Sequence, residues 1–130
     1  MATILIVEDD PIVCETMRDL LQAAGHDVAV AADGMRGLEI LRTVPRRFVV
    51  LLDLMMPRKS GFDVLSDVVE NQELARRHAF VLVTANAGLL PPLRVAERMG
   101  ALHMAVPVLA KPFRRDDLLQ VVAWAEQRLV

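Results

Sequence analysis

Four short apolar runs in this sequence are each followed by polar side chains that can bind a cation or a phosphoryl group. In chain order, these polar residues are Glu8 with Asp9, then Asp53, Thr84 and Lys111. Carboxylates that lie close together repel one another unless one of them is protonated or a cation lies among them. What these residues can do chemically therefore depends on whether the elements that carry them bring them together.

The apolar runs have the length and composition of buried β-strands. Unbroken β-branched and aliphatic runs of this length are typical of strands that are buried on both faces of a parallel sheet. The predicted strands cover residues 4–7, 28–30, 48–52, 80–83 and, more weakly, 106–109. The last is weaker because Pro107 has no N–H donor, which suits the edge of a sheet.

Helical patterns separate these strands. The first helix starts at Pro11 and stops at Gly25, and Asp33 and Ser60 are suited to cap the next two helices. A fourth helix is predicted from residues 91–92 through 99, and a fifth over residues 116–129. Strand and helix thus alternate five times, which predicts an α/β fold with a doubly wound parallel sheet.

Ligands bind beyond the carboxyl ends of the strands in such sheets, where the polar residues of this chain are expected to meet. A site with several carboxylates favours a hard divalent cation, and Mg²⁺ prefers oxygen ligands. Lys111 adds a point charge suited to a phosphoryl oxygen, and Thr84 adds a hydroxyl donor. The combination predicts a phosphoryl-transfer site in which Asp53 is the nucleophile and acceptor.

Composition excludes several other classes of protein. With 130 residues, a mean hydropathy of +0.36 and 25% charged residues, the chain differs from a disordered protein. Its net charge of −2 gives no attraction for nucleic acid, so direct binding of nucleic acid is not expected. Its longest apolar stretch contains Asp53 and is too short to span a membrane. One cysteine and no leader-like segment favour the cytoplasm. We expect one domain over residues 1–130 without an output domain.

The sequence resembles the receiver domains of two-component response regulators, including those of chemotaxis regulators, over essentially its whole length. Four segments in order carry the resemblance: ILIVEDDP at 4–11, DLMMPRKSG at 53–61, TA at 84–85 and KPF at 111–113. Each is weak alone, but together they are specific. The resemblance implies a flavodoxin-like (βα)5 sheet with strand order 2-1-3-4-5, and a phosphorylation switch rather than an enzyme.

The resemblance also implies a role for each matching residue. Asp53 would be phosphorylated, with Mg²⁺ bound by Asp53, Asp9, the Met55 backbone carbonyl and, through water, Glu8. Thr84 and Lys111 would bind the phosphoryl oxygens, and the Lys111–Pro112 peptide bond would be cis. The expected partners are a sensor histidine kinase or histidine phosphotransfer protein and a downstream protein target; the oligomeric state stays open.

Two features depart from the family pattern. Lys111 lies 27 positions after Thr84, about five more than is usual, so the fourth helix or its flanking loops should be longer. Val108 stands where the family usually has an aromatic ring that swings toward the phosphorylated site. We therefore expect signalling to use a rearranged fourth-helix segment or a different face.

Two alternative functions do not fit these residues. A haloacid-dehalogenase-like phosphatase would need a second Asp where Met55 stands, and a nucleotide or flavin site would need a phosphate-binding loop where Glu8 and Asp9 would repel phosphate. The remaining rival is a receiver fold that binds a partner without being phosphorylated.

Other polar and aromatic residues are interpreted as structural. The three histidines, His26, His78 and His103, are expected on the surface because they lack metal-ligand spacing. Asp10 is expected to cap the first helix, Cys14 to pack at its margin, and Trp124 to be partly buried.

Overall fold

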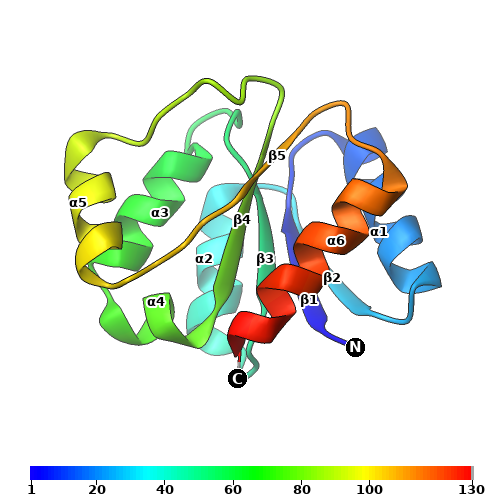
Figure 1. Ribbon diagram of the computed structural model, residues 1–130, viewed down its shortest axis with the longest axis horizontal. Coiled ribbons are helices and arrows are strands. Elements are labelled where there is room, and N and C mark those ends of the chain that lie inside the picture. Colours follow the sequence, from blue (N-terminus) through cyan, green and yellow to red (C-terminus); the bar gives the residue numbers. More distant parts are fainter. Residues whose placement is uncertain (130) are drawn as a thin grey trace.

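Five parallel strands form a single sheet in the order β2-β1-β3-β4-β5 (Figure 1). The computed structural model describes residues 1–129. The strands are β1 (Thr3–Val7), β2 (Asp27–Ala31), β3 (Val49–Asp53), β4 (Ala79–Thr84) and β5 (Val108–Ala110). The predicted fold class and strand order are therefore confirmed.

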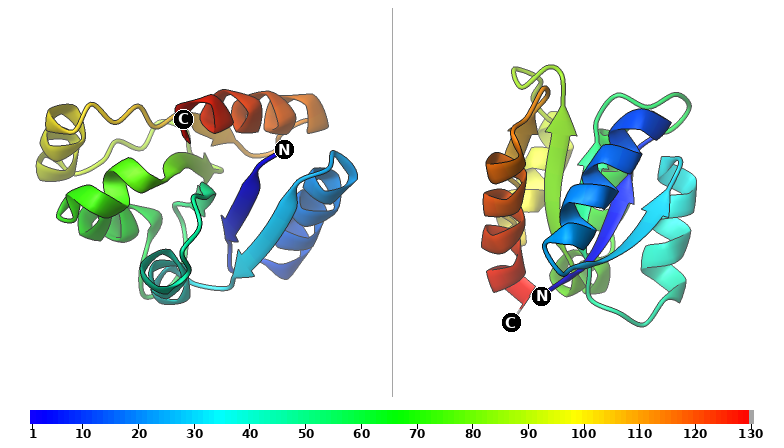
Figure 2. Two further views of the ribbon diagram at one scale, coloured as in Figure 1. Left: turned by 90° about the horizontal axis from the view of Figure 1, so that it is seen from below. Right: turned by 90° about the vertical axis from the view of Figure 1, so that its right-hand side faces the viewer.

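Helices cover both faces of this sheet (Figure 2). In chain order they are α1 (Pro11–Ala23), α2 (Gly34–Thr43), α3 (Gly61–Val69), α4 (Gln72–Arg77), α5 (Leu93–Ala101) and α6 (Arg115–Glu126), followed by the 3-10 turn η1 (Gln127–Leu129). Helices α1 and α6 pack on one face, and α2, α3 and α4 pack on the other. None of the helices in residues 1–129 is long and apolar enough to cross a membrane.

The three central strands explain why the apolar runs are unbroken. Every residue of β3 and β4 is buried, as are residues 4–7 of β1. Side chains alternate between the faces, so Ile4 and Ile6 join the core beneath α1 and α6, whereas Leu5 and Val7 join the core beneath α2 and α3. A strand with apolar neighbours on both faces needs apolar residues at every position.

The predicted helix caps are present. The Asp10 side chain accepts from the backbone N–H groups of Ile12 and Val13, and the Asp33 side chain accepts from Arg36 N–H. Ser60 forms a capping box with Asp63 at the start of α3. Asp10 and Asp33 thus start α1 and α2 within three residues of a strand end, whereas Ser60 starts α3 after a longer turn that follows Asp53.

The structure adds one helix to the predicted elements and shortens one strand. Helix α4 was not predicted, because its sequence, QELARR, contributes only Leu74 and Ala75 to the core. Strand β5 begins at Val108 rather than at residue 106. Pro107 still accepts a hydrogen bond from Leu82 N–H, but it cannot donate one, so the ladder does not extend toward the preceding residues.

The longer segment between Thr84 and Lys111 places α5 beside α3, at the edge of the molecule (Figure 1). Val95 is the buried residue of α5. Two arginines of α5, Arg94 and Arg98, reach the Glu70 carboxylate with N···O distances of 3.0 and 3.2 Å. The extra residues between Thr84 and Lys111 thus lie in α5 (Leu93–Ala101) and in the loops on either side of it, and the use of this segment in signalling stays a prediction.

One expected surface residue is buried. His78, the residue between α4 and β4, is 5% exposed, and its Nδ1 accepts a hydrogen bond from Phe48 N–H at 3.0 Å. His103 is exposed, and His26 is half-buried with its Nδ1 accepting from Ala2 N–H. The surface prediction was therefore wrong for His78, while Cys14 is buried and Trp124 half-buried.

Candidate functional site

Three carboxylates meet at the carboxyl edge of the sheet. Strand β1 pairs with β3 so that Val7 lies opposite Leu52, which places Glu8 and Asp53 side by side just beyond these partners. One carboxylate oxygen from each of Glu8, Asp9 and Asp53 lies within 4.8 Å of the others. Glu8 and Asp53 are buried and Asp9 is exposed, so the cluster is open to solvent on one side.

Lys111 lies against this cluster from the end of β5. Its Nζ is 3.0 Å from Glu8 Oε2 and 3.6 Å from Asp53 Oδ1. The Lys111–Pro112 peptide bond is cis, as predicted, and Lys111 N–H donates to the Thr84 carbonyl at 2.7 Å. The predicted lysine therefore reaches the site, but its shorter contact is with Glu8 rather than with Asp53.

Backbone N–H groups hold the acidic side chains in place. Met55 N–H donates to Asp53 Oδ1 at 3.2 Å, and Asp10 N–H donates to Glu8 Oε1 at 3.2 Å. The Thr84 hydroxyl is fully buried and accepts from Asn86 N–H at 3.0 Å. The Met55 side chain is exposed, whereas its backbone lies next to the Asp53 carboxylate.

Burial makes the negative charges in this cluster costly. The pKa of Glu8 is raised to about 7, chiefly by burial and also by the charge of Asp53, against the lowering effect of the hydrogen bond from Lys111. Burial also raises the pKa of Asp53, against the lowering effects of Met55 N–H and Lys111. Because the folded pKa of Glu8 is raised, the stability that this group contributes is lost as the pH rises from about 4.5 through about 7, and the raised pKa of Asp53 acts in the same direction.

A divalent cation is suited to this arrangement. Three carboxylates with oxygens within 4.8 Å supply the hard oxygen ligands that such ions prefer. A bound cation would also offset the repulsion among buried charges that a single lysine only partly neutralises. The donor set therefore fits a magnesium ion.

Comparison with known proteins decides the family of this chain. The model of the response regulator receiver domain matches residues 4–123. The chain belongs to the response regulator receiver family. A receiver domain is a phosphoacceptor module of two-component signal transduction, in which receivers interact with histidine kinases. The acidic pocket of Glu8, Asp9 and Asp53 is typical of the phosphoacceptor site of such domains.

Several curated proteins are similar to this receiver. The transcriptional regulatory protein DltR of Streptococcus agalactiae is 32% identical over 117 residues, covering 89% of this chain and 48% of DltR. The transcriptional regulatory protein CpxR of Escherichia coli is 29% identical over 136 residues, covering 98% of this chain and 53% of CpxR. The chain thus spans about half the length of these relatives.

Solved receiver structures share the fold. A CheY-like receiver from Methanospirillum hungatei is 26% identical with a TM-score of 0.80, covering 97% of this chain and 95% of that one. The receiver domain of the Pseudomonas aeruginosa sensor histidine kinase PA1611 is 25% identical with a TM-score of 0.75, covering 95% and 96% of the two chains. That structure contains a magnesium ion coordinated in its active site cleft.

One residue of the site emerges only from the structure. Gly61, the first residue of α3, lies so close to the β3–α3 turn that a Cβ atom there would be 2.6 Å from the Asp53 carbonyl oxygen. This glycine belongs to the segment DLMMPRKSG at 53–61, which gives it no function of its own. Its position eight residues after Asp53, beside the Ser60 cap, is the only signal that the sequence offers.

Neutralising Asp53 should stabilise the protein in the absence of magnesium. We expect Asp53→Asn to raise the free energy of unfolding by about 1–2 kcal/mol near pH 8, because it removes one of the buried charges that repel one another. Urea denaturation with and without MgCl2 measures this change. The wild type should gain more from the ion than the variant does.

The matched control is Asp19→Asn, which neutralises an exposed carboxylate on α1. It should change stability by less than about 0.5 kcal/mol and leave the response to MgCl2 unaltered. An Asp53→Asn variant that is less stable than the wild type in magnesium-free buffer would contradict the electrostatic account.

Proposed function

We propose that this receiver is a phosphorylation-dependent switch that accepts a phosphoryl group on Asp53 in the presence of Mg²⁺. The observation that carries the proposal is the position of Asp53 between the acidic side chains and Lys111. Its carboxylate lies within 4.8 Å of ligand oxygens of Glu8 and Asp9, and 3.6 Å from Lys111 Nζ. This arrangement supplies an acceptor, cation ligands and a positive charge together.

In the proposed reaction, an Asp53 carboxylate oxygen attacks the phosphorus atom of the donor. A new P–O bond forms, the bond from phosphorus to the leaving group of the donor breaks, and the product is an acyl phosphate. The Lys111 ammonium neutralises a phosphoryl oxygen, and the Thr84 hydroxyl donates a hydrogen bond to another. Met55 N–H keeps the acceptor carboxylate oriented during the transfer.

Asp9, Asp53 and the Met55 carbonyl are the direct ligands that we propose for Mg²⁺, with Glu8 acting through water. When bound, the ion neutralises charge on the carboxylates and on the transferred group. The contact between Glu8 and Lys111 keeps both residues beside Asp53. The raised pKa of Glu8 implies that cation binding releases protons and strengthens as the pH rises through about 7.

The proposed phosphodonor is a phosphohistidine on a sensor histidine kinase or a histidine phosphotransfer protein. The signal would then pass to a downstream protein target in the cytoplasm, where we expect this receiver to act. A second candidate is a partner-binding module that does not need phosphorylation. Val108 favours this alternative because it has no ring to couple Asp53 to the outer face, and it is exposed at the edge of the sheet.

Intact-mass measurement after incubation with acetyl phosphate and MgCl2 distinguishes these two functions. The switch predicts a single phosphoryl adduct, absent in Asp53→Asn and in samples with chelator, and retained in the surface control Asp19→Asn. Lys111→Gln should reduce the amount of adduct by at least about tenfold, because the charge opposite the phosphoryl oxygens is lost. A folded wild-type protein that forms no adduct with acetyl phosphate or with phosphorylated histidine phosphotransfer proteins would support the passive module.

A further inference from the structure

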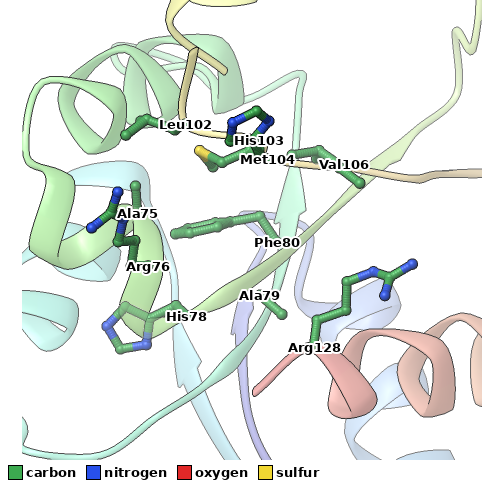
Figure 3. A pocket seen from close by; sticks show the side chains of 11 residues that line it. Ala75, Arg76, His78, Ala79, Phe80, Leu102, His103, Met104, Val106 and Arg128 are labelled. Atoms are coloured by element: carbon green, nitrogen blue, oxygen red, sulfur yellow. The ribbon is translucent and has the colours of Figure 1, made fainter. Parts of the chain in front are cut away.

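A cavity lies beside the first residues of β4, far from the phosphoacceptor site at the other end of the strand. Its volume is about 190 Å3, and its walls come from α4, the start of β4, residues 102–106 and the C-terminal turn η1 (Figure 3). Ala79 and Phe80 line it, whereas the acidic cluster lies beyond Thr84 at the other end of the same strand. The cavity therefore shares no residue with the proposed phosphorylation machinery.

The path of the chain before β5 explains why the cavity exists. The β4–β5 ladder begins with Leu82 opposite Val108, so the edge of β4 at residues 79–81 has no strand beside it. Pro107 cannot donate a backbone hydrogen bond, and residues 102–106 form no strand, although Leu102, Met104 and Val106 pack against the core that contains Phe80. The long connection between Thr84 and Lys111 thus leaves a space at a position where a longer edge strand would close the sheet.

Apolar side chains form the floor of the cavity. Phe80 is 2% exposed, and Met104 is half-buried beside it (Figure 3). Leu102 and Val106 extend this surface along the segment that leads into β5. An aromatic ring and a flexible thioether accommodate a compact apolar group, particularly another aromatic ring.

Positively charged and imidazole side chains surround this floor, and none of the lining residues is acidic. Arg76 is exposed and forms no ion pair within residues 1–129. The Arg128 side chain also reaches the rim, but its guanidinium points away from Phe80 (Figure 3) and lies 3.9 Å from the centre of the Trp124 ring, which does not line the cavity. Arg76 is therefore the rim cation that is free to meet a ligand. His103 lies above Met104 in Figure 3, on the side of the cavity opposite His78.

We propose that this cavity binds a small carboxylate with a compact aromatic or branched apolar body. The body packs on Phe80 and Met104, and the carboxylate interacts with the rim cations, chiefly Arg76, which has a free guanidinium fork. The volume corresponds to roughly six water molecules, which suits a ligand of about ten non-hydrogen atoms. A bound ligand would join α4 to the segment that leads into β5.

Phenylacetate and its neutral isostere phenylacetamide are the probes for this site. In a titration at pH 7 followed by amide and methionine-methyl NMR, phenylacetate should cause saturable shifts at Phe80, His103 and Met104. The dissociation constant should be roughly millimolar, as expected for a ligand of this size. Phenylacetamide should bind at least about fivefold more weakly, because it lacks the charge that the rim recognises.

Arg76→Gln tests the role of the rim without altering the apolar floor. It should bring the affinity for phenylacetate down to that for phenylacetamide, while Arg42→Gln, which removes an exposed arginine of α2, should bind both probes like the wild type. The proposal is overturned if phenylacetate causes no saturable shift in the folded protein, or if the two probes bind equally. It is also overturned if the shifts map to another surface or are insensitive to Arg76→Gln.

Discussion

Replacing Gly61 by alanine should destabilise this receiver by about 3 kcal/mol and displace its acceptor aspartate. A Cβ atom at this position would lie 2.6 Å from the Asp53 carbonyl oxygen and 2.9 Å from Leu54 Cα. Both are backbone atoms, so a side-chain rotation cannot relieve the contact. Either α3 or the turn after β3 must move, although Gly61 N–H and the Leu54 carbonyl hold them together with a hydrogen bond of 3.1 Å.

Gly100→Ala is the matched control, because a Cβ atom there would have no neighbour within 4 Å. Gly100 lies within α5, where alanine is the better helix former, so the control should be stabilised by up to about 1 kcal/mol. Urea denaturation gives the free energy of unfolding, and adduct formation with acetyl phosphate reports the position of Asp53. A Gly61→Ala variant that matches the wild type in both assays would refute the close-contact argument.

Local patterns predicted the elements whose structure depends on nearby residues. Residues 4–7 are apolar without interruption because β1 has core residues on both faces, and that requirement is visible in the sequence. Asp10 and Ser60 act as caps because their side chains accept from N–H groups only two or three residues away. Such interactions need no knowledge of the rest of the fold.

The candidate site was predictable because a parallel sheet brings separate strand ends to one edge. Glu8, Asp53 and Lys111 meet there although more than 100 positions separate the first from the last. The finer arrangement was not predictable, since the preference of Lys111 for Glu8 over Asp53 depends on differences of less than 1 Å between contacts. Family resemblance supplied the roles, but not these geometries.

Features that depend on distant packing were missed. Helix α4 has too few apolar residues to produce a helical pattern, and its Leu74 and Ala75 are buried only because α3 lies beside them. The cavity depends on the path of residues 102–106. Pro107 predicted only that the strand next to these residues is weak and lies at the edge of the sheet. His78 offered one signal, because it precedes Phe80 by two positions and an extended chain directs both side chains to the same side, where their rings meet.

The buried His78 should make the protein sensitive to acid. The pKa of His78 is lowered to about 4, chiefly by burial and also by the charges of Arg77 and Arg47, against the raising effect of the Leu41 backbone carbonyl. Its Nδ1 accepts from Phe48 N–H, so the neutral ring carries its proton on Nε2. Adding a second proton would break the hydrogen bond to Phe48 and place a charge in the core.

The direction of the pH effect follows from the two states. The unfolded chain protonates this histidine near its ordinary pKa of 6.5, whereas the folded protein does so only near 4. Stability from His78 is therefore fully present above about pH 6.5 and is lost as the pH falls toward 4. The total loss is about 3 kcal/mol, of which about 2 kcal/mol should appear between pH 7 and pH 5.

Comparison with His78→Gln isolates this contribution. Glutamine can still accept from Phe48 N–H but does not titrate, and the effects of Glu8 and Asp53 are common to both proteins and cancel in the difference. The variant should be less stable than the wild type at pH 7, because it packs less well against Phe48 and Phe80. Urea denaturation from pH 7 to pH 5 should show this gap narrowing by about 2 kcal/mol. The control is His103→Gln, which removes an exposed histidine. If the difference in free energy of unfolding between the wild type and His78→Gln stays constant from pH 7 to pH 5, His78 does not cause the acid sensitivity.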